Sequence, residues 1–152
     1  KGTGEKIRSD RRDVYKKLAG IREWRRKLSN EWIAPIDVDG HQWQTVEHLY
    51  QGSKYKKSRP DIYYQFTLDS RSELGKSVDR AKKFKDFEPD MDFFGKRGKE
   101  VLNNALEAKF KQHIDLRKML TLTMDATLME YQPKKPAAMA FELMKIRKNL
   151  TV

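Results

Sequence analysis

The sequence predicts an α+β fold, a mostly helical single domain with a small antiparallel sheet. Apolar residues recur at helical spacing over most of the chain, and Asp39-Gly40 joins two short runs in the pattern of a two-residue β-hairpin. Of the 152 residues, 38% are apolar, which is enough for a core although 36% are charged. The chain contains no cysteine, which excludes a disulfide framework and a thiolate nucleophile.

The N-terminal part is basic. Residues 1–9 combine glycine with polar residues, which predicts disorder. From Asp10 to about Lys27, apolar residues recur at helical spacing, which predicts a basic amphipathic helix that Gly20 splits. We therefore expect residues 1–27 to form a basic extension and residues 28–152 to form the main domain.

The middle of the chain begins with the expected hairpin at residues 36–43. Thr45 is a suitable N-cap for a helix that ends before Pro60. Residues 61–66 predict a short helix, and residues 70–83 are helical in composition. Gly75 within them suggests the close approach of a second helix or of a ligand.

The last part of the chain is mainly helical. Residues 85–95 predict a loop, and residues 99–112 predict a helix with a continuous apolar face. A further helix is expected around residues 116–124, a strand at residues 127–131, and a terminal helix along the apolar stripe of residues 139–150.

The net charge of +11 requires an explanation. Residues 1–27 alone hold eleven lysine and arginine side chains against four acidic ones, a net charge of +7. Further basic clusters lie within residues 54–59 and 76–85. Such fields favour phosphate-rich partners, which include nucleic acid, nucleotides and ADP-ribose. A solvated basic surface without a partner is the alternative.

No apolar run approaches the roughly 18 residues of a membrane-spanning helix, and no signal-peptide pattern is present. We therefore expect an intracellular protein, in the cytoplasm or the nucleus, without a membrane partner. The chain starts at Lys1 rather than at a methionine, as a processed product or a piece of a longer protein would. The sequence does not indicate an oligomeric state.

Residues 45–55 carry the densest set of reactive side chains. Glu47, Gln51 and Lys54 follow i, i+4, i+7 spacing, so a carboxylate, an amide and an amine share one helix face. A carboxylate and an amine held close together can perform acid–base or Schiff-base chemistry on a sugar carbon. An exposed ion pair is the common alternative for this spacing.

The histidines and tryptophans indicate less. The three histidines are scattered without metal-ligand spacing, so we predict no metal site and no cofactor. A single histidine such as His48 is more often structural than catalytic. Trp24, Trp32 and Trp43 are expected in the core or at the rim of a pocket, where one of them can stack on a base.

Two sequence blocks nevertheless resemble the NADAR family. The first block consists of Leu28-Ser29-Asn30, Val38-Asp39-Gly40, Trp43, Thr45-Val46-Glu47-His48-Leu49-Tyr50-Gln51 and Lys54-Tyr55. The second consists of Leu106-Glu107-Ala108-Lys109-Phe110-Lys111-Gln112-His113 with Leu116-Arg117, and Leu74-Gly75-Lys76 lies between the two. The blocks follow the order of the family over residues 28–131, which makes the signal specific.

The resemblance implies an α+β fold and cleavage of an N-glycosidic bond. Substrates of the family are phosphorylated ribosylamino-pyrimidines or ADP-ribosylated guanine in nucleic acid. By resemblance, Glu47 is the catalytic acid and Lys54 is the amine that forms a Schiff base with ribose C1. The residues implied in substrate binding are Asn30, Trp43, His48, Gln51, Gly75 and Lys76.

Two family features are missing from this chain. Members carry a glycine- and tryptophan-containing loop after the strand that corresponds to residues 127–131, whereas residues 131–138 contain no glycine, tryptophan or aspartate. A family tryptophan upstream of the second block is also absent, and Phe93 or Phe94 is the nearest substitute. These departures predict either a divergent enzyme or a member that has lost activity. The alternative function is a basic nucleic-acid-binding or structural component, such as part of a large DNA virus particle.

Overall fold

The computed structural model describes residues 2–6, 14–131 and 134–150, and the chain divides into two compact units. One unit combines Lys1–Trp32 with His113–Val152, and the other is Ile33–Gln112. Each unit contains helices and a small antiparallel sheet. This composition confirms the predicted α+β class.

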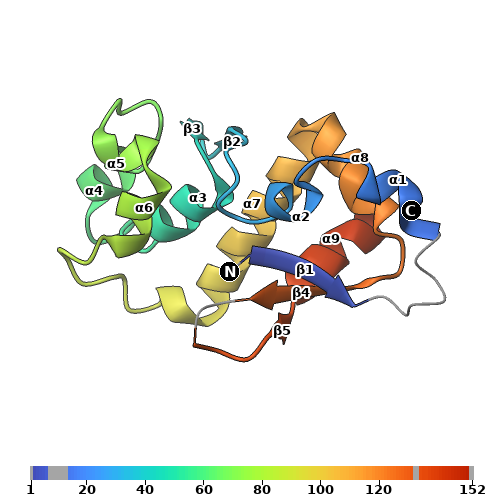
Figure 1. Cartoon of the computed structure of the whole chain (residues 1–152). Coiled ribbons are helices and arrows are strands. Elements are labelled where there is room, and N and C mark those ends of the chain that lie inside the picture. The colour runs from blue at the N-terminus through green and yellow to red at the C-terminus, as the bar shows by residue number, and fades with distance from the viewer. Residues whose placement is uncertain (1, 7–13, 132–133, 151–152) are drawn as a thin grey trace. The chain divides into compact units, whose positions relative to one another are not determined.

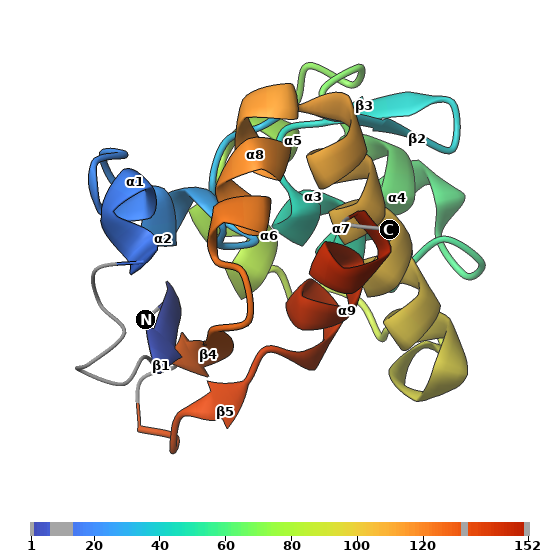
Figure 2. The same cartoon turned by 90° about the vertical axis from the view of Figure 1, so that its right-hand side faces the viewer.

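The sheet of the first unit has three antiparallel strands, in the order β1-β4-β5. Strand β4 (Thr127–Tyr131) pairs with β1 (Gly2–Lys6) and with β5 (Ala138–Met139), as Figure 2 shows. The prediction of disorder was therefore wrong for residues 2–6. Gly4, which suggested disorder, allows a close approach, because a Cβ atom there would clash with the ring of Tyr131.

Two short helices follow in place of one long N-terminal helix. Helix α1 (Lys16–Ala19) and helix α2 (Trp24–Lys27) are separated at Gly20, as the sequence predicted. Leu18 and Trp24 are buried, so these two members of the apolar stripe reach the core. Residues 7–13 lie outside the described part of the chain.

The helices α8 (Ile114–Leu122) and α9 (Phe141–Leu150) complete the first unit and confirm two predicted elements. They contact one another, and α9 also contacts β4. Leu120 and Ile146 are fully buried in this core. The Arg147 guanidinium ties α9 to the segment before β4 by donating hydrogen bonds to the Thr123 hydroxyl and the Ala126 carbonyl.

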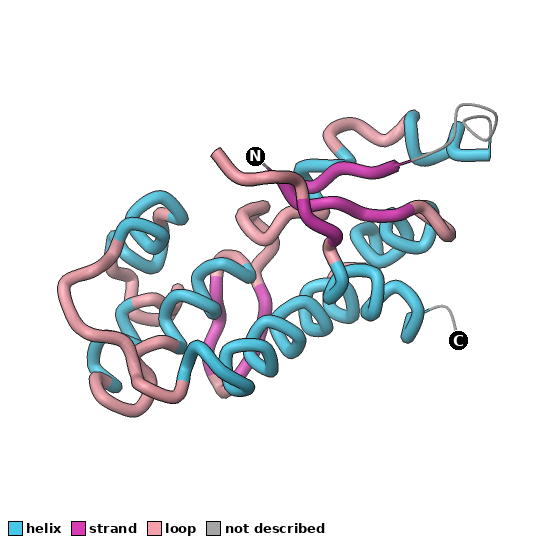
Figure 3. Tube along the Cα trace, turned by 90° about the horizontal axis from the view of Figure 1, so that it is seen from below, coloured by secondary structure: helices cyan, strands magenta, loops and turns pink. Residues whose placement is uncertain are grey.

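The second unit begins with the predicted hairpin, formed by β2 (Ile36–Val38) and β3 (His41–Trp43). Asp39 and Gly40 have φ values of 58° and 77°, which are the positive angles that a two-residue hairpin turn requires. The tube in Figure 3 shows this short pair of strands in magenta. The indole N–H of Trp43 donates to the Val38 carbonyl across the hairpin, at 3.0 Å.

Helix α3 (Val46–Ser53) is the centre of the second unit (Figure 1). It contacts α4 (Pro60–Gln65), α6 (Val78–Lys83) and α7 (Gly98–Gln112). Because α3 is packed on several sides by other helices, its remaining face is held in a fixed orientation.

The predicted helical segment 70–83 consists of two helices, α5 (Glu73–Lys76) and α6. Ser77 separates them because its backbone is extended and its hydroxyl caps α6. Gly75 is required for packing, since a Cβ atom there would clash with the Thr67 carbonyl. The close approach predicted at Gly75 is thus made by the backbone of the same unit.

Candidate active site

Helix α3 is fixed at its start by a buried hydrogen-bond pair. Thr45 is the N-cap, and its hydroxyl oxygen accepts a bond from the backbone N–H of His48 at 3.0 Å. The same hydroxyl lies 2.8 Å from Nδ1 of His48, whose Nε2 lies 3.1 Å from the Leu74 carbonyl. Nε2 therefore donates to Leu74, and Nδ1 accepts from Thr45.

His48 is fully buried, and both of its ring nitrogens have partners within the unit. Burial lowers the pKa of His48, although backbone hydrogen bonds at Leu74 and Ser77 act in the opposite direction. The ring is therefore neutral near pH 7 and joins α3 to the α5–α6 segment. Protein groups thus engage both ring nitrogens of His48, and its contact with substrate, which the family resemblance implies, stays a prediction.

The reactive face of α3 carries Glu47, Tyr50, Gln51 and Lys54, which are all half-buried. Burial lowers the pKa of the Lys54 ammonium, the negative charge of Glu47 raises it, and the positive charge of Lys85 lowers it again. The net shift is downward. Glu47 and Lys54 are therefore close enough to influence one another, as their spacing on the helix predicted.

Two aromatic rings border the Lys54 amine. Its Nζ atom lies 5.7 Å from the ring centre of Tyr50 and 5.5 Å from that of Phe94. Phe93, next to Phe94, is fully buried and meets the Tyr50 ring edge-on at 5.1 Å. An ammonium facing an aromatic ring is attracted to it, so the rings favour the charged form of Lys54, whereas burial of the amine disfavours that form.

A pair of charged residues holds the end of α3 beside these rings. The backbone N–H of Asp90 donates to the Lys54 carbonyl, and the Asp90 carboxylate accepts from the backbone N–H groups of Lys57 and Ser58. The Arg97 guanidinium donates to Asp90 at 2.8 Å and to the Ser53 carbonyl at 3.0 Å. We call these two residues the Asp90–Arg97 clamp.

Protein groups donate hydrogen bonds to the Asp90 carboxylate of the clamp in place of water. Burial by itself would raise the pKa of Asp90, but the hydrogen bonds from Ser58 and Lys57 and the charge of Arg97 lower it below its usual value. The hydrogen bonds from Lys57 and Arg97 likewise lower the pKa of the neighbouring Asp92 to about 2. Both carboxylates therefore stay ionised in neutral solution, and the clamp persists there.

The remaining predicted site residues differ in position. Trp43 is fully buried, and its indole N–H is bonded within the hairpin. Gly75 is a packing position, and Lys76 is exposed on α5. Gln51 shares the face of Glu47 and Lys54. Asn30 is half-buried in the other unit.

Lys109 is a second lysine with an altered proton affinity. It belongs to α7 and is only 1% exposed, with its Nζ atom 5.2 Å from the ring centre of Phe110. Burial lowers the pKa of Lys109 to about 7. Lys109 follows Ala105 by four residues and Leu106 by three, so helical spacing alone could have placed it on the buried face of α7.

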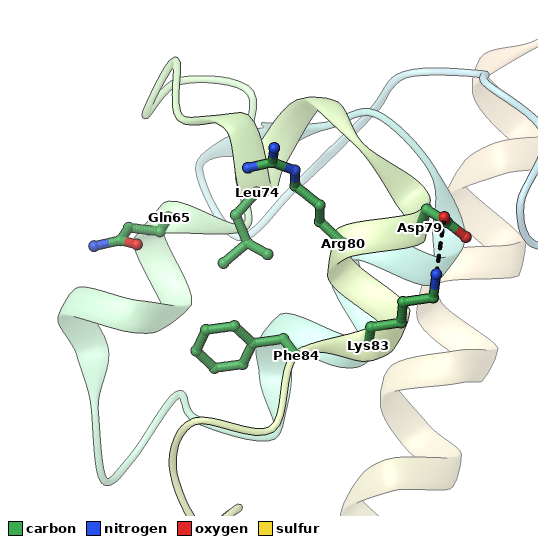
Figure 4. A pocket seen from close by; sticks show the side chains of 6 residues that line it. All are labelled: Gln65, Leu74, Asp79, Arg80, Lys83 and Phe84. Atoms are coloured by element: carbon green, nitrogen blue, oxygen red, sulfur yellow. Dashed lines mark hydrogen bonds and ion pairs between the residues drawn. The ribbon is translucent and has the colours of Figure 1, made fainter.

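A groove of about 490 Å³ opens on the α4–α6 side of the same unit (Figure 4). Its lining residues are Gln65, Leu74, Asp79, Arg80, Lys83 and Phe84. Glu47 and Lys54 are not among them, so this groove is separate from the reactive face of α3.

Among residues 2–6, 14–131 and 134–150, no group of three or more histidine, aspartate or glutamate side chains is arranged to hold a metal ion. None of the helices in these ranges combines the length and the apolar character that crossing a membrane requires.

The partners of Lys54 were only partly predictable. Tyr50 precedes Lys54 by four residues, so helical spacing alone could have identified it. Phe94 and the Asp90–Arg97 clamp belong to a loop and to η2 (Phe93–Arg97), which lie some forty residues downstream. No local pattern links that segment to α3.

Comparison with known proteins agrees with the motif blocks. The model of the NADAR domain matches residues 16–136. N-glycosidase YbiA of Escherichia coli K12 is 35% identical over 107 residues, and that of Shigella flexneri is 32% identical over 106 residues. Each alignment covers 68% of this chain and 61% of the relative, so the chain spans less than two thirds of those proteins.

The fold agrees as well. The NMR structure of YbiA from Escherichia coli superposes with a TM-score of 0.63 at 27% sequence identity, over 82% of this chain and 77% of that one. The domain match contains α3 with its Glu47 and Lys54, the Asp90–Arg97 clamp and most of both units. This chain therefore belongs to the NADAR family.

Proposed function

We propose that the chain is an N-glycosidase that cleaves the bond between a base and the C1 atom of a ribosyl or ADP-ribosyl group. One observation carries the proposal. Helix α3 brings the Glu47 carboxylate under the influence of a half-buried Lys54 amine, whose pKa is lowered and whose surroundings include the rings of Tyr50 and Phe94. The NADAR domain match covers this part of the sequence, and relatives named N-glycosidase align with 68% of the chain.

In the proposed reaction, Glu47 supplies the proton that the departing base takes up. The neutral Lys54 amine adds to C1 and gives up its two N–H protons as the imine forms. One proton goes to the ring oxygen as the C1–O bond opens, and the other returns to the Glu47 carboxylate as the C1–N bond to the base breaks. The product of this step is an imine between Nζ and C1. Water then hydrolyses the imine, which releases the open-chain sugar and restores the amine. The net change is addition of one water to the glycosidic bond.

The substrate must also offer phosphate. We propose ADP-ribosylated guanine or a phosphorylated ribosylamino-pyrimidine, since both place phosphate near a ribosyl–nitrogen bond. Gln51 on the reactive face is suited to orient a ribose hydroxyl or the base edge, and the exposed Lys76 is suited to a phosphate.

Reductive trapping tests this function directly. The full chain is incubated with each candidate substrate and borohydride, and the adduct is mapped by mass spectrometry. We expect a ribosyl adduct on Lys54 and release of the free base. Lys99→Ala, a change at an exposed lysine of α7, is the control and should leave the adduct in place. Base release without any adduct would contradict the Schiff-base step, and no release from any substrate would contradict the function.

A second candidate function is a non-catalytic member that binds nucleic acid through its basic surface. The net charge of +11 and the family loop missing from residues 131–138 favour it. Deleting residues 1–27 is an unsuitable test, because β1 pairs with β4 and its loss would disturb the sheet. Neutralising the exposed Lys16, Lys17 and Arg22 to glutamine keeps the strand. Under this function, binding to DNA becomes weaker and less dependent on salt.

A further inference from the structure

The groove beside α6 combines an apolar floor with a held aromatic ring. Figure 4 shows the side chains of Leu74 and Phe84 facing one another, with Gln65 at the edge. The Phe84 ring lies edge-on to Tyr55 and to Phe66, at 5.4 Å from each. Since these contacts fix the ring, its remaining surface is a preformed contact for a flat ligand.

Of the two basic side chains at the rim of the groove, Lys83 is paired with a carboxylate among the described residues and Arg80 is not. Lys83 points toward Asp79, and the two form an ion pair at 3.3 Å. Arg80 is exposed, and in the described part of the chain its guanidinium has no carboxylate partner. Residues 76–85 contain Arg80 and four lysines, Lys83 included, against the single carboxylate of Asp79, so the local field is positive.

We propose that this groove binds a nucleotide, with the base against Leu74 and Phe84 and the phosphate on Arg80. A volume of about 490 Å³ is sufficient for a base and its sugar. Stacking on an aromatic ring tolerates any base, and a guanidinium holds phosphate with two parallel hydrogen bonds. The proposal is independent of the reaction at Lys54, which does not line the groove.

A nucleotide can arrive free or as part of a single strand, and both sources are tested. The ¹⁵N-labelled full chain is titrated with AMP in one NMR experiment and with a four-residue thymidine oligonucleotide in another. We expect shifts of Leu74, Phe84 and the Arg80 side-chain N–H signal in at least one titration. Shifts with the oligonucleotide alone indicate a strand, and shifts with AMP alone indicate a free nucleotide.

The variant Arg80→Gln should weaken binding roughly tenfold, because one charge-assisted phosphate contact is lost. Arg80→Lys should recover part of that loss, and Lys99→Gln is the control for a charge outside the groove. Equal weakening by Arg80→Gln and Lys99→Gln would overturn the site. Shifts confined to Tyr50, Lys54 and Phe94, or no binding of either probe, would also overturn it. Trapping at Lys54 in the same variants reports separately on the proposed reaction.

Discussion

Lys54 and Lys109 both hold their proton less tightly than an ordinary lysine, but their surroundings differ. Lys54 is half-buried, and a carboxylate, a second lysine and two rings act on it. Lys109 is fully buried in α7, and burial alone brings its pKa to about 7. Access to solvent therefore distinguishes the two more clearly than proton affinity does.

The comparison shows that a lowered pKa does not identify a catalytic amine. A nucleophile must be unprotonated and must also reach a substrate atom. Lys109 meets the first requirement near pH 7, whereas its 1% exposure prevents the second in this conformation. Lys54 is less buried than Lys109 and shares its helix face with Glu47, the acid of the proposed reaction.

The largest expected effect is loss of the trapped adduct when Lys54 is replaced, with no such loss when Lys109 is replaced. Lys54→Ala and Lys54→Arg should both abolish the borohydride-trapped adduct, because neither side chain is a nucleophilic amine at neutral pH. Lys109→Met should retain the adduct, since the replaced side chain does not touch substrate. Mass spectrometry of all three variants is the measurement. Loss of the adduct in a folded Lys109→Met protein would reverse the assignment.

Replacing the carboxylate tests the partner of Lys54. Glu47→Gln should lower turnover by about 10²–10⁴-fold, the usual contribution of a general acid. Because the charge of Glu47 raises the pKa of Lys54, the variant should also move the onset of adduct formation to lower pH. The check is the trapping rate measured between pH 5 and 9. An onset displaced to higher pH would contradict the proposed electrostatic coupling.

A variant of the Asp90–Arg97 clamp tests how much the activity of Lys54 depends on the contacts that hold the end of α3. Arg97→Gln leaves the nearly buried Asp90 carboxylate without its cation, so the free energy of unfolding should fall by roughly 2–4 kcal/mol. Turnover should fall with little change in KM, because the substrate itself is not contacted. Urea unfolding and steady-state kinetics measure the two effects.

A matched control for the clamp is available on the same turn. Lys96→Gln removes an exposed charge whose nearest carboxylate, on Glu100, lies 3.7 Å away. Its effect on unfolding should stay within about 0.5 kcal/mol. Equal losses in Arg97→Gln and Lys96→Gln would show that the clamp has no special role.

The last prediction concerns the pH dependence of the stability of the fold. Lys109 titrates near pH 7 when folded and near its ordinary pKa of 10.5 when unfolded. Between those values the unfolded chain binds more protons, so stability rises with pH, by up to about 1.4 kcal/mol per unit from this group. Below pH 7 both states are protonated and the contribution is constant. Lys109→Met should flatten the rise, as urea unfolding at pH 7, 8 and 9 would show.

Local signals were sufficient for much of the fold. The positive φ values of Asp39 and Gly40 follow from turn chemistry, and the start of α3 follows from the Thr45 cap. The split of the N-terminal helix at Gly20 is local as well. These features depend on neighbours within about four residues, which a single sequence displays directly.

The secondary-structure predictions that failed concern segments whose conformation depends on contacts that local patterns do not show. Residues 2–6 form a strand only because β4, more than 120 residues later, supplies their hydrogen-bond partners. Strand β5 was also not predicted, since its two residues depend on pairing with Met129 and Glu130. The segment 70–83 divides at Ser77, where the hydroxyl caps a helix that composition alone made continuous.

The sequence by itself determined the family resemblance and the placing of Glu47, Gln51 and Lys54 on one helix face, because helical spacing is a local property. Tertiary structure alone decided the solvation of each side chain. It buried His48 and Lys109, and it left Lys54 half-buried between Tyr50 and Phe94. Proton affinity depends on solvation and on charges from distant segments, so the character of the Glu47–Lys54 pair follows only from the packed fold.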